Sequence, residues 1–224
     1  MFLGHFGVAF AAKKAAPKTS LGTLVFAAQF ADMLWPILLL LGVEHVRIVP
    51  GLLPASPFDF TSYPISHSLA TQLGWGALLG LFYFAIRRDG RSALLVGGLV
   101  PTHWLLDFAA HRPDMPIYPG GGEYGLGMWN SIPLTISVEY VLFAAGIALY
   151  ISATRAKYTT GKLAFWSLVG LLGVLYPASL FGPPPPSVHA LAWSAIAIWL
   201  TVPWAAWADR RRQSNWDQPE TTSP

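Results

Sequence analysis

The chain has 224 residues, of which 54% are hydrophobic and only 11% are charged, and its net charge is +3. Soluble domains carry about 25% charged residues, so this composition argues against a soluble domain and indicates an integral membrane protein. The chain has no cysteine, which excludes disulfides and thiolate-bound metals. Any metal ion would have to be bound by His, Asp and Glu.

The first residues, "MFLGHFGVAFAAKKAAPKTS", are apolar but too short to cross a bilayer. They differ from a signal peptide because the basic residues follow the apolar run. The pattern predicts a re-entrant half-helix that starts inside the membrane domain with His5 and ends at the lysines. A flat interfacial helix fits the pattern equally well.

Six later segments are long and apolar enough to span a membrane, which takes about 20 residues. The predicted fold is therefore all-α, a polytopic membrane helix bundle in one transmembrane domain, residues 1–208. Residues 209–224 are expected to form a disordered polar tail in the cytoplasm. The predicted spans are residues 20–43, 66–86, 92–111, 131–153, 162–181 and 188–208.

The basic residues define the expected orientation of these spans. All but two of the 14 Lys and Arg side chains fall at one end of the predicted bundle, and only Arg47 and Arg112 fall at the other. By the positive-inside rule the basic end faces the cytoplasm, together with both chain termini. Because the positive charge is explained by topology, no nucleic-acid partner is expected.

Ionisable residues occur inside the predicted spans. In "PTHWLLDFAAHRPD", His103, Asp107 and His111 follow one another at four-residue intervals, which places them on one face of a helix. Asp32, His67 and Glu139 lie in other spans. With a helical rise of about 1.5 Å per residue, these groups reach overlapping depths in the middle-to-outer half of the membrane.

No Lys or Arg lies in the interior of any span, since Lys162 is only the first residue of its span, so protons or a metal ion must neutralise these carboxylates. His and carboxylate groups suit a zinc ion, and a carboxylate can bridge two ions. A proton relay or a hydrogen-bond network remains the alternative. Arg112 follows His111 directly. It either binds a phosphate or carboxylate of a substrate, or contacts lipid headgroups or Asp114.

Four motifs in order, "GHFGVAF", "FADMLWP", "YPISHSL" and "THWLLDFAAHRPD", resemble the bacterial membrane-bound metal-dependent hydrolase-like family, the inner-membrane proteins that LexA regulates in some bacteria. The resemblance covers roughly residues 1–145. It implies a multi-pass protein of the bacterial inner membrane that hydrolyses its substrate with a metal ion. The last two predicted spans contribute no motif.

The order of the ligands is also similar to that of zinc-dependent phospholipase C. That family has a His four residues before its Glu, whereas this chain has Thr135 there, so the resemblance implies one or two ions, of zinc or another divalent metal. The metal ligands that it implies are His5, Asp32, His67, His103, Asp107, His111 and Glu139.

The predicted function is a membrane-embedded zinc hydrolase, similar to a phosphoesterase, that acts on a phosphoester of a lipid or lipid-linked substrate. Asp32 is expected to act as a general base or bridging ligand, with Asp107 as the second catalytic carboxylate, and Arg112 is expected to bind the substrate. A transporter that moves a metal ion or protons through the same cluster is the alternative. A scaffold with a structural metal is a third interpretation.

Overall fold

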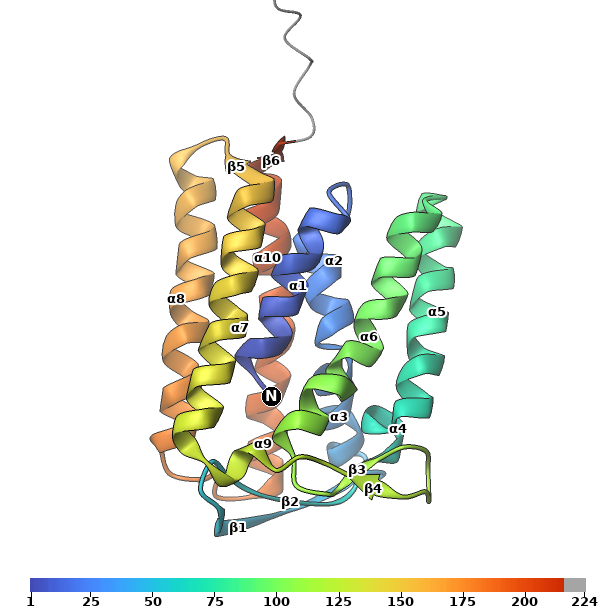
Figure 1. The fold of residues 1–224 in the computed structure, drawn as a ribbon, viewed down its shortest axis with the longest axis vertical. Helices are drawn as coiled ribbons and strands as arrows, with labels where there is room; N and C mark the ends of the chain where they lie inside the picture. Colours follow the sequence, from blue (N-terminus) through green and yellow to red (C-terminus); the bar gives the residue numbers. More distant parts are fainter. Residues whose placement is uncertain (216–224) are drawn as a thin grey trace, which may run out of the picture.

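The computed structural model describes residues 1–215, which form a mostly helical bundle (Figure 1). Five helical segments are long and apolar enough to cross a membrane, as predicted for a membrane protein. They are α5 (Leu69–Arg87), α6 (Gly90–Ala110), α7 (Ile132–Ala153), α8 (Thr159–Phe181) and the segment Val188–Arg210. The last comprises α9 (Val188–Ile196), the 3₁₀ helix η2 (Ala197–Leu200) and α10 (Thr201–Arg210).

The first predicted span, residues 20–43, is broken. It consists of α2 (Leu21–Ala28) and α3 (Phe30–Leu40), which are bent by 56° at Gln29. If this pair is one span, the bundle has six. The break matters for the site, because it frees the carbonyl of Ala28 for a contact with a side chain of α6.

The N-terminal segment forms α1 (Leu3–Ala15), which packs against α7, α2 and α6. Phe6 and Phe10 of α1 are fully buried. In Figure 1 the helix runs from the middle of the bundle, where the N-terminus lies, towards the end that carries β5 and β6.

Two glycines bring α1 and α7 into close contact. A Cβ atom on Gly7 would lie 2.4 Å from the carbonyl oxygen of Leu142, and one on Gly146 would lie 2.1 Å from that of Gly7. Only hydrogen fits between backbones at these distances. The close approach places the start of α1 beside Glu139 of α7.

Side-chain caps define where most of the long helices begin. The oxygens of Ser20, Ser68, Asp89, Ser131 and Ser187 accept hydrogen bonds from backbone N–H groups in the first turns of α2, α5, α6, α7 and α9. These short polar residues stand between apolar runs, so they separate one helix from the next.

Prolines inside helices leave carbonyls without their usual donor. Pro177 of α8 lacks the N–H that would bond Gly173, and the Tyr140 hydroxyl of α7 donates to that carbonyl at 2.7 Å. In α10, Pro203 is the third residue after the 3₁₀ helix η2.

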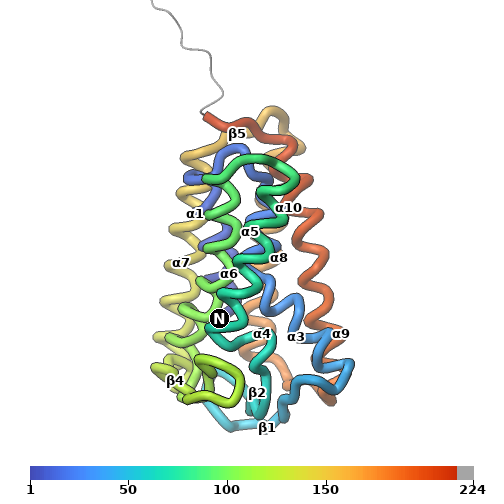
Figure 2. Tube along the Cα trace, turned by 90° about the vertical axis from the view of Figure 1, so that its right-hand side faces the viewer, coloured from blue at the N-terminus to red at the C-terminus, as the bar shows by residue number. Residues whose placement is uncertain are grey.

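One end of the bundle carries two hairpins that the all-α prediction did not include. β1 (His45–Leu53) pairs antiparallel with β2 (Ser56–Ser62), and β3 (Met115–Pro116) with β4 (Glu123–Tyr124). The short helices α4 (Pro64–His67) and η1 (Met128–Asn130) lie near them. Figure 2 shows β1, β2 and β4 together below the helices.

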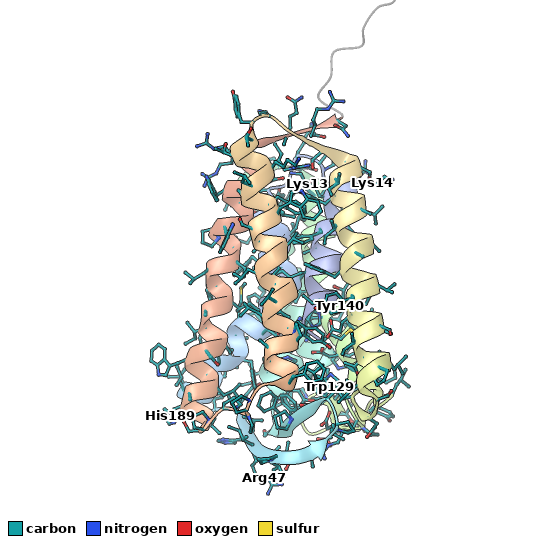
Figure 3. All side chains as sticks on the ribbon, turned by 90° about the vertical axis from the view of Figure 1, so that its left-hand side faces the viewer. Lys13, Lys14, Arg47, Trp129, Tyr140 and His189 are labelled. Carbon is teal, nitrogen blue, oxygen red and sulfur yellow. The ribbon has the colours of Figure 1, made fainter. Side chains whose placement is uncertain are left out.

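The opposite end carries most of the basic residues. β5 (Thr154–Ala156) pairs with β6 (Arg212–Ser214) there, so the start of the predicted tail is ordered. Residues 216–224 of that tail lie outside the described residues. Figure 3 places Lys13 and Lys14 at this end and Arg47 and His189 at the other.

Candidate metal centre

Five of the predicted ligands meet between α1, α3, α4 and α6. They form two groups, and within each group the ligating atoms lie within 4.8 Å of one another. One group is His5, His103 and Asp107, and the other is Asp32, His67 and His103. His103 belongs to both. The two groups are possible sites for a metal ion, and they join residues that are up to 102 positions apart in sequence.

His103 is fixed by the break between α2 and α3. Its Nδ1 lies 2.9 Å from the carbonyl oxygen of Ala28, and because a carbonyl only accepts, Nδ1 carries the proton. In the neutral ring, Nε2 then has its lone pair directed into the site. Within residues 1–215 this buried nitrogen makes no hydrogen bond of acceptable geometry, although Asp107 Oδ2 lies 3.2 Å away.

His67 is oriented by Ser66 and Glu44. The Ser66 hydroxyl donates to Glu44 Oε2 at 2.5 Å, so its oxygen is left to accept from His67 Nδ1 at 2.7 Å. Glu44 also accepts from the backbone N–H groups of Ile65 and Ser66 at 2.7 and 2.9 Å. His67 Nε2 thus presents its lone pair to Asp32 and Asp107, whose nearest oxygens lie 3.6 and 3.8 Å away.

His5 completes the set from α1. Its ring stacks on that of His103 with centroids 3.6 Å apart, and its Nε2 lies 3.2 Å from Asp107 Oδ1. The α-amino group of Met1 contacts the same carboxylate oxygen.

The two carboxylates differ in exposure. The Asp107 side chain is 3% exposed, whereas that of Asp32 is 26% exposed. Asp32 is therefore the more exposed of the two carboxylates of the cluster.

Glu139 does not belong to either group. Its two carboxylate oxygens accept hydrogen bonds from the backbone N–H groups of Phe2 and Gly4 at 2.8 and 2.7 Å. These bonds satisfy N–H groups at the start of α1, which have no partner within the helix. Glu139 thereby holds the segment that carries His5.

His111 also lies outside the two groups. Its Nδ1 bonds to Asp114 Oδ1 at 2.9 Å, and its ring packs on Trp129 with centroids 4.1 Å apart. Burial lowers the pKa of His111, which favours the neutral ring. Tyr63 donates a hydrogen bond to the backbone oxygen of Asp114 at 2.9 Å, so this cluster joins β2 to the end of α6.

Arg112 is held by two carboxylates. Its guanidinium pairs with Asp59 of β2 and with Asp114, the latter at 3.1 Å. The pairing with Asp114 that the sequence left open is therefore present. Burial alone would raise the pKa of Asp59, but hydrogen bonds from Arg47 and Arg112 outweigh it and hold that pKa below its usual value.

Sequence reasoning missed Glu44 and Ser66. Ser66 directly precedes His67, and "ISHS" offers a hydroxyl next to an imidazole, so its role had a local signal. Glu44 had none, because it lies 22 residues from Ser66 in a segment expected to be a loop.

No known family, curated protein or solved structure matches this chain. Its function therefore has to be argued from the residues of the cluster.

The cluster fits a divalent metal ion by three features. Three imidazoles and two carboxylates converge, which are suitable donors. His103 and His67 each have Nδ1 bound to a fixed oxygen and Nε2 turned inward, as metal-ligating histidines typically do. His103 Nε2 is also a buried nitrogen that the described residues leave without a hydrogen bond.

Proposed function

We propose that the protein is a membrane-embedded, metal-dependent hydrolase that acts on a phosphoester of a lipid or lipid-linked substrate. The observation that carries the proposal is the convergence of three imidazoles and two carboxylates around His103, because a metal ion held by such donors would suit phosphoester hydrolysis. Zinc is the proposed metal, since it takes nitrogen and oxygen ligands. The resemblance to the membrane-bound hydrolase family and to zinc-dependent phospholipase C led to the same expectation from the sequence, but no family model matches the chain.

His5, His67, His103 and Asp107 are the proposed ligands, with Asp32 as a ligand or base. The chemistry that such an ion supplies when bound is Lewis-acid activation of a water and of a phosphoryl oxygen. Asp32 is the more exposed of the two carboxylates in the cluster, so it is the proposed base that accepts the proton of the attacking water. Glu139 and His111 act as supports in this scheme, through the contacts described above.

A lipid substrate is proposed because the cluster lies within the helices of the bundle. An amphiphile in the membrane can reach it laterally, close to Asp32. Arg112 remains the proposed contact for a phosphate. It lies beyond the end of α6, and its side chain is 32% exposed despite its two carboxylate partners.

The proposed location is the bacterial inner membrane, with the basic end and both termini in the cytoplasm. The site would then lie towards the outer side, under the two hairpins. The separation of Lys13 and Lys14 from Arg47 along the bundle supports this orientation (Figure 3).

The activity is tested by incubating the purified protein with a total lipid extract and analysing the products by mass spectrometry. Zinc-loaded protein is compared with chelator-treated protein and with Asp32→Asn. We expect products of phosphoester hydrolysis only from the zinc-loaded wild type. Turnover that persists equally in all three samples would contradict the proposal.

A transporter remains the second candidate, because the structure contains one feature typical of that class. Transporter sites are often built at broken helices, and the α2–α3 break lies at the cluster. Sealed vesicles containing the protein distinguish the two functions. Zinc uptake into the lumen without any phosphoester turnover would favour transport.

A further inference from the structure

A second polar site lies at the basic end of the bundle, opposite the metal-ligating cluster. It is an open cavity of about 360 Å³ lined by the α1–α2 turn, the end of α5, the end of α10 and the antiparallel strand pair β5–β6. Five cationic side chains and one carboxylate line it: Lys13, Lys18, Arg87, Lys157, Arg212 and Asp209.

The single carboxylate is already fully engaged. Asp209 Oδ2 accepts from Lys13 Nζ at 2.7 Å and from the backbone N–H of Leu21 at 3.0 Å, and Oδ1 accepts from the Tyr150 hydroxyl at 2.9 Å. Its charge neutralises that of Lys13. Within residues 1–215, none of the other four cations of the cavity lies within ion-pair distance of a carboxylate.

Arg212 is fixed in the wall of the cavity. Its Nε and Nη2 donate to the side chain and backbone oxygens of Thr154 at 2.9 and 3.1 Å. Its guanidinium lies over the rings of Tyr150 and Phe165. A rigid guanidinium binds an anion at a smaller entropic cost than a free side chain.

Lys18, Arg87 and Lys157 are exposed and come from three different elements around the same cavity. Their like charges repel one another, and within residues 1–215 no carboxylate lies within ion-pair distance of any of the three. An anion relieves this repulsion, and Arg and Lys are the side chains that bind phosphate oxygens.

We propose that this cavity binds a phosphate group, carried either by the headgroup of an anionic phospholipid or by a soluble phosphate ester. Its volume accommodates a phosphate with a small organic substituent. The proposal is independent of the metal-ligating cluster and of the function assigned to it.

Basic residues also gather at one end of a membrane protein for topology alone. The chain offers a control for that interpretation. Lys14 and Arg155 are exposed at the same end but do not line the cavity. Replacing them removes the same charge from the same end and leaves the cavity unchanged.

The test uses the full chain in a non-ionic detergent and two probes. Native mass spectrometry measures retention of phosphatidylglycerol against phosphatidylcholine, and calorimetry measures binding of inorganic phosphate. Binding of phosphatidylglycerol that phosphate does not displace identifies the lipid headgroup as the ligand. Binding of phosphate that displaces the lipid identifies the soluble ester.

The double variant Lys18→Gln/Lys157→Gln is expected to weaken binding of the effective probe about tenfold, because two charge-assisted contacts are lost. The control Lys14→Gln/Arg155→Gln is expected to change it less than about twofold, since exposed charges that do not line the cavity are screened by solvent and salt. Equal losses in both variants would overturn the proposal, as would failure of the wild type to bind either probe.

Discussion

Glu44 is the residue that determines how His67 is presented to the metal-ligating groups. Its carboxylate is 1% exposed and accepts three hydrogen bonds, one of them from the hydroxyl that holds His67 Nδ1. Together the three bonds use both carboxylate oxygens, Oε1 for the two backbone N–H groups and Oε2 for the Ser66 hydroxyl. A residue that touches no ligand directly thereby fixes the tautomer and direction of one.

Replacing this carboxylate is expected to weaken metal binding. Glu44→Gln offers one acceptor oxygen and adds an N–H pair facing other donors, so Ser66 and His67 lose their fixed orientation. We expect zinc affinity to fall by about 10- to 100-fold, measured by competition with a chelator of known affinity. Glu123→Gln, an exposed carboxylate of β4 at the same end, is the control. Equal affinities in the two variants would remove Glu44 from the site.

Most residues of the cluster could be predicted from the sequence, but the residues that orient them could not. Spacing on α6 predicted that His103 and Asp107 share a face, and both lie in the cluster. The same spacing extended to His111, which the chain turns towards Asp114, because α6 ends at Ala110 and His111 has extended backbone. A helical repeat carries no information beyond the residue where its helix ends.

At the scale of elements, the packing of α1 against α7 positions one side of the cluster. Gly7 and Gly146 allow the two backbones to touch, and Glu139 then bonds the start of α1. The sequence predicted a half-helix carrying His5, with its depth left open between two alternatives. The contacts of its buried face with α7, α2 and α6 could not be predicted, because a short apolar run does not specify its partners.

A methyl group at this contact is expected to separate the helices. In Gly146→Ala the added Cβ would meet the carbonyl oxygen of Gly7, and overpacking of this kind destabilises by about 1–3 kcal/mol. Thermal unfolding in detergent measures the change. Gly170→Ala of α8 is the matched control, since its Cβ meets nothing within 4 Å. Its melting temperature is expected to stay equal or rise, because alanine favours the helix. Equal melting temperatures for the two variants would show that the contact is not tight.

The other elements show where a hydropathy pattern stops being informative. Five of the six predicted spans correspond to membrane-length helical segments. About twenty apolar residues in a membrane can satisfy their own backbone hydrogen bonds only by forming a helix. The pattern did not reveal the 56° break at Gln29 or the β1–β2 hairpin. Both depend on contacts with distant residues, such as the bond between Ala28 and His103 and the pairing of Asp59 with Arg112.

At the scale of the whole molecule, the two ends of the bundle differ in chemistry. One end gathers the basic residues and the second cavity, and the other carries the hairpins and lies nearer the metal-ligating groups (Figures 1 and 3). If the basic end is cytoplasmic, the two sites act on opposite sides of the membrane.

This orientation can be measured directly because the chain has no cysteine. Lys14→Cys and Arg47→Cys each introduce one exposed thiol, at opposite ends. A membrane-impermeant maleimide applied to intact cells is expected to label Arg47→Cys, and to label Lys14→Cys only after permeabilisation. The reverse pattern would place the basic end outside.

The central claim, that the cluster binds metal, depends most directly on His103, which belongs to both ligand groups. Elemental analysis of zinc-loaded, desalted protein is expected to give about one or two ions per chain for the wild type. His103→Ala is expected to retain little metal, while His189→Ala, an exposed histidine outside both groups, retains the wild-type amount. Unchanged metal content in His103→Ala, or a wild type that binds none, would contradict the account.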